Sequence, residues 1–298
     1  MKRQSGREGE KIARWYAFVP ALVLTLCACH PLPMTTAAGP LAPPPTGHVR
    51  VAGIVLKWLT GNKAGNVERI EPLVREAAAN GARIVVTTEG FLDGYAVRDK
   101  SMPLDEFRHL GEPIPDGPFF RHAAALADEL DIYFVAGMSE AAGAVRYNTA
   151  VLIGPDGALI GRYRKQAIGH EAGRHTPGNE HPVFATPYGT VGLMICADRR
   201  QPSIARQLKA NGADFLIVPS GGMSGRRNDG FVRDRSRENN IPIVFVHPIE
   251  FLVTAPDGSI LARAMFGDRV AIEADERDGE HDSRAVFYVD VDIGSGTD

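Results

Sequence analysis

The sequence predicts an α/β domain whose two halves repeat one pattern of strands and helices. Short apolar runs typical of buried strands alternate with segments whose apolar residues recur at helical spacing. Each half then ends in two strand-like segments joined by a Pro-Asp-Gly turn, at residues 155–157 and 256–258. These observations indicate one domain with internal pseudo-symmetry.

In the first half, apolar residues recur at helical spacing from Val67 to Ala77, and Gly81 supplies a stop signal. A second amphipathic segment begins at Pro118, and Gly154–Gly157 is a turn signal. The expected elements are strands at His48–Trp58, Arg83–Thr88 and Ile132–Ala136, helices at Asn66–Asn80 and Pro118–Asp131, and a hairpin of Asn148–Ile153 with Ala158–Arg164.

The second half repeats this order after the apolar run Val191–Ile195, and Pro202 is placed to begin a helix. Pro242 precedes the last buried run before the second hairpin. The expected elements are helices at Ser203–Asn211 and near Asp229–Asn239, strands at Ala213–Val218 and Ile243–Val246, and a hairpin of Phe251–Thr254 with Ser259–Arg263.

The composition is that of a globular protein. Hydrophobic residues make up 44% of the 298 residues, enough for a sizeable core. The formal net charge is −3 and the pI is near 6.3, so there is no basic excess for binding nucleic acid. No phosphate-binding loop and no Cys/His cluster with metal-ligand spacing is present in the sequence, so we expect neither a cofactor nor a metal.

The N-terminal residues have the layout of an export signal. Basic residues between Lys2 and Arg14 precede the apolar run Trp15–Cys29, which contains Pro20. This run is shorter than the ~20 residues that a membrane-spanning helix needs. We therefore expect a signal peptide at residues 1–29 that is cleaved.

The end of this signal, Leu26–Cys29, resembles the lipobox of bacterial lipoproteins, in which the final cysteine is lipidated. The Pro-, Ala- and Thr-rich residues 30–47 are typical of a linker, and residues 48–298 would form the domain. The resemblance implies an exported protein on the periplasmic side, held to a bacterial membrane through lipidated Cys29. A plain signal peptide and an uncleaved signal anchor are alternatives.

Cys196 is the first candidate for the chemistry of the domain. Cys27 and Cys29 fall in the leader, so the domain has no second cysteine with which to form a disulfide. Cys196 lies between a predicted strand and a predicted helix, where backbone N–H groups and the helix dipole favour a thiolate and a developing oxyanion. The alternative is that Cys196 is a small buried hydrophobe.

Glu89, Lys165 and Glu171 are further candidates, because each lies at or after the end of a predicted strand. Glu89 follows a predicted strand at the sheet edge where ligands bind in α/β folds, so it is a candidate general base. Lys165 follows another predicted strand, and Glu171 lies in the loop after it. Taken singly, each of them could equally be a solvated surface charge.

Together, Glu89, Lys165 and Cys196 resemble the Glu-Lys-Cys triad of the nitrilase superfamily of carbon–nitrogen hydrolases. The resemblance extends from about His48 to about Ile293. The motifs that carry it are Thr88-Glu89-Gly90 with Gly94-Tyr95, Gly161-Arg162-Tyr163-Arg164-Lys165, Thr176-Pro177-Gly178, the segment Gly192–Pro202, Gly212-Ala213-Asp214, Pro219-Ser220 and Arg235–Asn239.

The family resemblance implies a four-layer α-β-β-α sandwich and an amidase-like hydrolase that forms a Cys196 thioester. Glu89 would act as base and then acid, and Lys165 with the backbone N–H of Ala197 would stabilise the oxyanion. Glu171, the family's second glutamate, would orient the substrate or keep Lys165 charged. The implied substrate is a small amide-type molecule, and the implied assembly is a homodimer or larger homo-oligomer.

This sequence departs from the family pattern in three places. Thr88 stands where the family usually has proline, Ser203 stands where many members have glutamate, and the loop from Lys165 to Glu171 is short. Next to the cysteine, Asp198 and Arg200 are expected to brace the turn that bears it, because such side chains bond to backbone groups and to each other.

Three arginines in the loops that would shape the pocket, Arg174, Arg226 and Arg227, could meet a substrate carboxylate or could be solvated surface. Three other functions remain open: an N-acyltransferase with the same acyl-enzyme, a catalytically inactive lipid-anchored binding protein, and a Cys-His peptidase. The histidines available for the last are His170, His175, His181 and His247.

Overall fold

The computed structural model describes residues 41–222, 227–265 and 284–292. The expected signal peptide at 1–29, its lipidation site Cys29, most of the linker at 30–47 and Arg226 lie outside the described residues. No helix in the described ranges is both long and apolar enough to cross a membrane.

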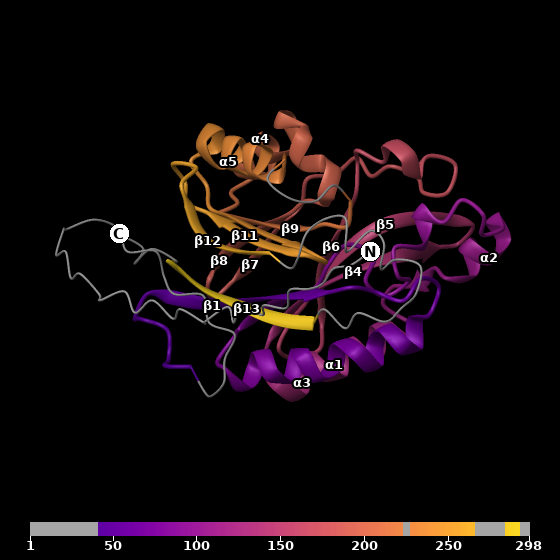
Figure 1. Cartoon of the computed structure of the whole chain (residues 1–298), viewed down its shortest axis with the longest axis horizontal. Helices are drawn as coiled ribbons and strands as arrows, with labels where there is room; N and C mark the ends of the chain where they lie inside the picture. The colour runs from indigo at the N-terminus through magenta and orange to yellow at the C-terminus, as the bar shows by residue number, and fades with distance from the viewer. Residues whose placement is uncertain (1–40, 223–226, 266–283, 293–298) are drawn as a thin grey trace, which may run out of the picture. The chain divides into compact units, whose positions relative to one another are not determined.

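Two mixed sheets form the centre of the domain (Figure 1). The first sheet has seven strands in the order β13-β1-β2-β4-β5-β6, with β3 paired to β4. Its strands are β1 (His48–Leu56), β2 (Ile84–Val86), β3 (Glu112–Pro113), β4 (Tyr133–Ala142), β5 (Val145–Ile153), β6 (Leu159–Arg164) and β13 (Arg284–Asp292).

The second sheet has six strands in the order β12-β11-β10-β9-β8-β7. Its strands are β7 (Val183–Thr186), β8 (Gly189–Leu193), β9 (Phe215–Pro219), β10 (Ile243–His247), β11 (Glu250–Thr254) and β12 (Ile260–Met265).

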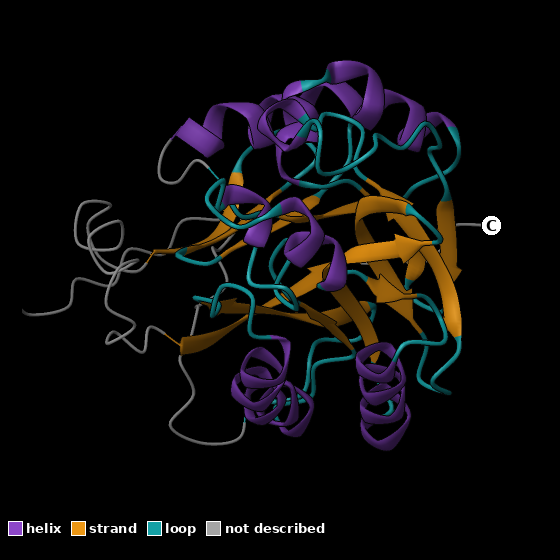
Figure 2. Cartoon of the chain, turned by 90° about the vertical axis from the view of Figure 1, so that its right-hand side faces the viewer, coloured by secondary structure: helices purple, strands orange, loops and turns teal. Residues whose placement is uncertain are grey.

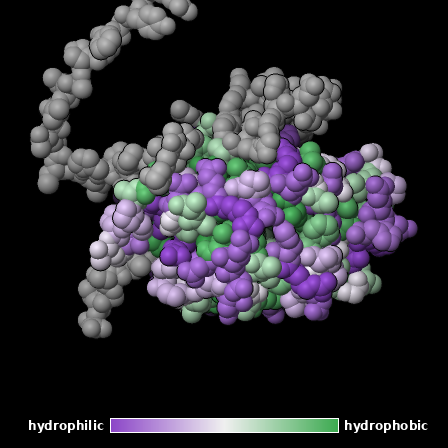
Figure 3. Space-filling model, turned by 90° about the horizontal axis from the view of Figure 1, so that it is seen from below, coloured by the Kyte–Doolittle hydropathy of each residue, from purple (hydrophilic) through white to green (hydrophobic). Residues whose placement is uncertain are grey.

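Helices cover the outer face of each sheet, as Figures 1 and 2 show. Helices α1 (Lys63–Ala79) and α3 (Pro118–Leu130) lie on the first sheet, and α4 (Pro202–Ala210) and α5 (Arg227–Asn239) lie on the second. Hydrophilic residues are spread over the solvent side of the α1 and α3 layer (Figure 3). The predicted four-layer sandwich is confirmed.

The two halves have the same topology. In the first, β1, β2 and β4 pair in parallel, and β5 and β6 follow antiparallel. In the second, β8, β9 and β10 pair in parallel, and β11 and β12 follow antiparallel. Each Pro-Asp-Gly turn joins the last two strands of its half, so the predicted internal repeat is confirmed.

Helix boundaries follow from local chemistry. The side chain of Asn62 accepts a hydrogen bond from the N–H of Gly65 at 2.9 Å and caps α1. Pro118 opens α3, where its missing N–H has no helical partner to lose. Asp131 ends α3 in the left-handed conformation, with φ of 53°.

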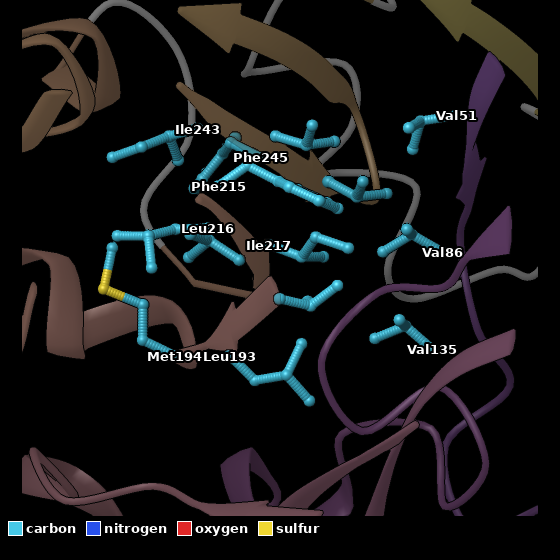
Figure 4. Packing of buried hydrophobic residues seen from close by; sticks show 14 of the residues in the cluster. Val51, Val86, Val135, Leu193, Met194, Phe215, Leu216, Ile217, Ile243 and Phe245 are labelled. Carbon is cyan, nitrogen blue, oxygen red and sulfur yellow. The ribbon is translucent and has the colours of Figure 1, made fainter. Parts of the chain in front are cut away.

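The main core lies between the two sheets, where valines of the first face larger side chains of the second (Figure 4). In β1, alternate residues such as Val49 and Val51 belong to this core, whereas Ala52 and Ile54 pack with α1 and α3. Strand β1 is apolar on both sides because both of its faces are covered.

Several elements were not expected from the sequence: β3, β7, β13 and the short helix α2 (Leu104–His109). Strands β7 and β13 are antiparallel additions at the edges of the repeat. Strand β13 pairs with β1 from His48 to Leu56, at the opposite end of the domain sequence. Pairing between such distant segments leaves no local pattern to recognise.

Gly53 in β1 lets the sheets approach closely. A Cβ atom added there would lie 2.3 Å from the ring of Phe251 in β11. Gly161 in β6 has the same relation to Phe184 in β7, where the distance would be 2.1 Å. The first sheet therefore uses glycine where the second presents a phenylalanine ring.

We predict that Gly53→Val lowers the free energy of unfolding by about 1–3 kcal/mol, because the new side chain overpacks the core against Phe251. Denaturation in guanidinium chloride measures this change. The control is Gly230→Ala in α5, where an added Cβ meets nothing within 4 Å. Alanine there should leave stability unchanged or raise it. Equal midpoints for the two variants would contradict the close approach.

Candidate active site

Glu89, Lys165 and Cys196 each lie just beyond the end of a strand. Glu89 follows β2, Lys165 follows β6, and Cys196 opens the 3-10 helix η3 (Cys196–Arg200) after β8. The three residues are 0%, 1% and 5% exposed, respectively. Surface charges would be solvated, so the burial of Glu89 and Lys165 excludes that interpretation for both.

Lys165 joins two carboxylates in a buried ion cluster. Its Nζ lies 2.6 Å from Oε1 of Glu89 and also donates to Oε1 of Glu171. Burial lowers the pKa of Lys165, but the negative charges of Glu89, Cys196 and Glu171 outweigh it and hold the pKa above its ordinary value. Lys165 is therefore a permanent cation at this site.

The structure places Glu171 against Lys165 despite the short loop between them. It ends the 3-10 helix η2 (Gly169–Glu171) and is 0% exposed. His175 Nδ1 lies 3.0 Å from its Oε2. Burial raises the pKa of Glu171, but the hydrogen bond with His175 and the charge of Lys165 lower it to about 2. Glu171 is therefore ionised at neutral pH.

Asn148 is a site residue that sequence reasoning missed. Its Nδ2 donates to Glu89 Oε1 at 2.8 Å and to Glu171 Oε2 at 3.0 Å. Strand β5 holds it there, because the N–H of Lys165 donates to the carbonyl of Asn148 at 2.8 Å. The sequence did contain one indication of this role. An amide residue begins the predicted strand Asn148–Ile153, whose last four residues are apolar.

The second oxygen of Glu89 is unpaired within the described part of the chain. Oε2 is buried and has no hydrogen-bond partner among the residues that the structure describes. A Cβ atom added to Gly221 would lie 2.9 Å from this oxygen and 3.2 Å from the ring of Trp58. Trp58 in turn packs against Tyr95, with ring centroids 5.3 Å apart. An unpaired buried carboxylate oxygen is available to accept a proton.

Cys196 is held in the left-handed conformation, with φ of 45°. Only the surrounding structure keeps a residue with a side chain in this conformation, so such strain is a feature of functional turns. The Sγ atom lies 3.8 Å from the carbonyl oxygen of Gly222. It also accepts a hydrogen bond from Nη1 of Arg199 at 3.5 Å. Ala197, whose N–H was expected to bind an oxyanion, is half-buried next to it.

Asp198 braces the cysteine turn, as expected. It is 0% exposed and accepts hydrogen bonds from the N–H of Ile195 at 3.0 Å and from the hydroxyl of Tyr163 at 2.9 Å. It also accepts from the N–H of Ala167 at 2.7 Å. Burial raises the pKa of Asp198, and these bonds oppose the rise. Asp198 thus ties the Cys196 turn to the segment after Lys165.

The expectation that Arg200 also braces this turn is wrong. Arg200 is exposed, whereas Arg199 is 1% exposed and points inward. Arg199 is buried and Arg200 is exposed because the tight turn of the 3-10 helix η3 directs adjacent side chains to different sides.

Of the three arginines expected near the pocket, Arg174 lies in a loop and Arg227 begins α5. Arg174 donates from Nη2 to the carbonyl of Met102 at 2.6 Å, and Arg227 is exposed.

Within the described ranges, the Cys196 side chain forms hydrogen bonds with Gly222 and Arg199 and with no histidine. That arrangement does not favour a Cys-His peptidase. In the part of the chain described, no group of three or more acidic, His or Cys side chains could hold a metal ion.

Comparison with known proteins identifies the family. The family model named carbon-nitrogen hydrolase matches residues 50–275. The chain belongs to the carbon–nitrogen hydrolase family. Three of the motifs that carry the family resemblance contain Glu89, Lys165 and Cys196, which follow strands β2, β6 and β8.

Individual relatives have amidase or nitrilase names. A nitrilase of Pyrococcus abyssi is 36% identical over 157 residues, which cover 52% of this chain and 58% of the relative. The omega-amidase of Homo sapiens is 34% identical over 182 residues, 57% of this chain and 62% of the relative. An N-carbamoylputrescine amidase of Solanum lycopersicum is 32% identical, with 57% and 58% covered. Each match spans less than two thirds of the relative's own length.

Solved structures share the fold. A branch 10 member of the nitrilase superfamily from Saccharomyces cerevisiae superposes with a TM-score of 0.68 at 24% identity, covering 83% of this chain and 90% of that one. A mutant amidase from Nesterenkonia sp. AN1 in complex with butyramide gives 0.68 at 20% identity, with 84% and 93% covered.

We predict that Glu171→Gln flattens the dependence of stability on acidic pH. The pKa of Glu171 is about 2 in the folded chain against an ordinary value of 4.5. Its contribution to stability is therefore complete above pH 4.5 and is lost as the pH falls towards 2. Urea midpoints across this window measure the slope, which should be smaller in the variant.

The control for this prediction is Glu106→Gln, at an exposed position in α2. It should keep the slope of the unmodified protein. A slope in Glu171→Gln as steep as that of the unmodified protein would show that the Lys165 cluster does not hold this carboxylate ionised.

Proposed function

We propose that this protein hydrolyses a small amide-type carbon–nitrogen bond through a thioester on Cys196. The observation that carries the proposal is the buried cluster of Lys165, Glu89 and Glu171, whose charges act on Cys196. A buried cluster of this kind stabilises a fold only weakly, because desolvation opposes it. Its position beside a strained cysteine turn favours a chemical role.

In the acylation step, Oε2 of Glu89 takes the proton of the Cys196 thiol. The sulfur attacks the amide carbonyl carbon, and a C–S bond forms as the carbonyl π electrons move to oxygen. Lys165 Nζ and the N–H of Ala197 stabilise this oxyanion, which is worth on the order of 3 kcal/mol per donor. Protonated Glu89 gives its proton to the leaving nitrogen, the C–N bond breaks, and ammonia or an amine departs.

In the second step, Glu89 takes a proton from water, and the oxygen attacks the thioester carbon. The oxyanion again forms beside Lys165 and collapses as the C–S bond breaks. The sulfur leaves as the thiolate and regains a proton from Glu89, and the carboxylic acid is released. One carboxylate therefore serves as base and acid in turn, which suits a group with one free oxygen.

The names of similar proteins support this chemistry. Relatives are described as an omega-amidase, an N-carbamoylputrescine amidase and a citrullinase, all names of enzymes that act on carbon–nitrogen bonds. In a mutant of an amidase from Nesterenkonia sp. AN1, the acetamide moiety of fluoroacetamide adds covalently at the active-site cysteine. The corresponding reactive atom here would be the Cys196 sulfur.

We predict that Cys196→Ala abolishes hydrolysis and that Glu89→Gln slows it by about 10²–10⁴-fold, because a general base is lost. Ammonia release from a panel of amides, N-carbamoyl compounds and nitriles measures both. The matched control is Glu68→Gln on the exposed side of α1, which should keep full activity.

Turnover retained in Cys196→Ala would remove the thiol from the mechanism. Two alternatives give different outcomes in the same assay. An N-acyltransferase would form a new amide, detected by mass spectrometry, when an amine is added. An inactive binding protein would release no ammonia from any compound and would show a Cys196 thiol no more reactive than a free one.

We further propose that the chain is exported and that Cys29 is lipidated, on the basis of its leader and lipobox-like sequence. When the full chain is produced in a bacterium, it should partition with membranes. Cys29→Ala should move it to the soluble periplasmic fraction, as immunoblots of cell fractions would show. Equal membrane association of both forms would exclude the lipid anchor and leave a signal anchor.

A further inference from the structure

Arg199 is a buried cation that contacts the sulfur of Cys196. Its side chain is 1% exposed, and Nη1 donates to Sγ at 3.5 Å. A fully buried arginine is rare unless an anion compensates its charge, because removing a guanidinium from water is costly. The anion that compensates Arg199 therefore identifies its role.

The second hydrogen-bond partner of the Arg199 guanidinium is the side-chain amide of Asn228 and not a carboxylate. Nη2 donates to Oδ1 of Asn228 at 2.6 Å, and Nδ2 of Asn228 donates to Glu250 Oε2 at 2.8 Å. Within the described part of the chain, no carboxylate lies within ion-pair distance of Arg199. Asn228 separates the guanidinium from Glu250, and Arg263 contacts the other oxygen of that glutamate at 3.4 Å.

Three elements fix the direction of the guanidinium. Asn228 belongs to α5, Glu250 begins β11, and the ring of Phe245 in β10 lies 5.4 Å from the guanidinium carbon. Asn228 and Glu250 are 0% exposed. The second half of the fold thus holds a cation aimed at the sulfur.

The charge of Lys165 is shared between two carboxylates. Lys165 contacts the carboxylates of Glu89 and Glu171, and His175 contacts Glu171. Once Glu89 has taken the proton of the thiol, Glu171 balances the charge of Lys165, so this pair adds little net attraction for a thiolate. Lys165 and Tyr95 interact electrostatically with Cys196, and His247 and Glu250 interact electrostatically with Arg199.

Two of these groups stay neutral. Burial raises the pKa of Tyr95 well above its ordinary value. Burial and the charge of Arg199 lower the pKa of His247 to about 3. At neutral pH Tyr95 therefore adds no negative charge, and His247 adds no positive charge. Arg199 is a cation that contacts Sγ. Among the described residues no carboxylate pairs with it directly, and Glu250 acts on it through Asn228.

We propose that Arg199 is a further catalytic residue that holds Cys196 as a thiolate before substrate binds. In this step only the S–H bond breaks, and the proton passes to the free oxygen of Glu89. The inference rests on the proposed nucleophilic role of Cys196. It adds that Arg199 donates a hydrogen bond directly to the sulfur, whereas Glu171 shares the charge of Lys165.

The test follows the reactivity of Cys196 without any substrate. The full chain is treated with iodoacetamide between about pH 5 and 10, and mass spectrometry of the Cys196 peptide gives the alkylation rate. For Arg199→Met we expect the rate at neutral pH to fall about tenfold, because a hydrogen bond to a charged group is lost. The midpoint of the pH profile should rise by about one unit.

Two further variants make the result specific. Arg199→Lys keeps the charge and should retain a rate within about threefold of the unmodified chain. Arg206→Met removes an exposed arginine from α4 and should change nothing. Circular dichroism checks the fold of each. If Arg199→Met does not fold, Arg199→Gln replaces it, because glutamine keeps an amide donor for Asn228 and removes the charge.

A neutral variant that folds and keeps the profile of the unmodified chain would overturn the proposal. So would Arg199→Lys falling as far as Arg199→Met, since charge would then not decide reactivity. Alkylation rates test the role of Arg199. Ammonia release by Cys196→Ala tests the proposed function separately. A reactive thiolate in a chain whose hydrolysis survives Cys196→Ala would support Arg199 and refute the hydrolase mechanism.

Discussion

The candidate active site depends on a buried ion cluster in which Lys165 contacts the carboxylates of Glu89 and Glu171. Desolvation of three charges opposes folding, and only close pairing together with the two hydrogen bonds from Asn148 offsets it. Removing Lys165 would leave two carboxylates in the interior without their cation. The cluster therefore requires the first sheet and the loop that bears η2 to come together accurately.

The repeated topology explains how this accuracy is reached. Parallel strands in each half end at the same edge of their sheet, so residues that follow β2 and β8 are carried to the junction of the two sheets. Close contact of the sheets at Gly53 and Phe251 keeps that junction tight. Asp198 then couples the halves directly, because it accepts hydrogen bonds from the cysteine turn and from the segment after Lys165.

This geometry gives the two halves different electrostatic tasks. The first half contributes Glu89, Lys165 and Glu171, with an excess of negative charge suited to accepting and returning a proton. The second half contributes the sulfur and, through Asn228 and Glu250, the oriented Arg199. In the proposed mechanism the two halves of the repeat therefore differ, with the base in the first half and the nucleophile in the second.

By itself the sequence determined most strands and helices, the repeat with its two Pro-Asp-Gly hairpins, and the triad candidates Glu89, Lys165 and Cys196, because periodicity, turn residues and motifs are local properties. It did not predict β13, whose partner lies at the other end of the domain. Only the tertiary structure decided which buried polar groups meet. Asn148 and Arg199 gain their roles from partners far away in the chain, and a single tight turn buries Arg199 while exposing Arg200. Hydrogen bonds and ion pairs between distant segments exist only once the layers have packed, so no local pattern records them.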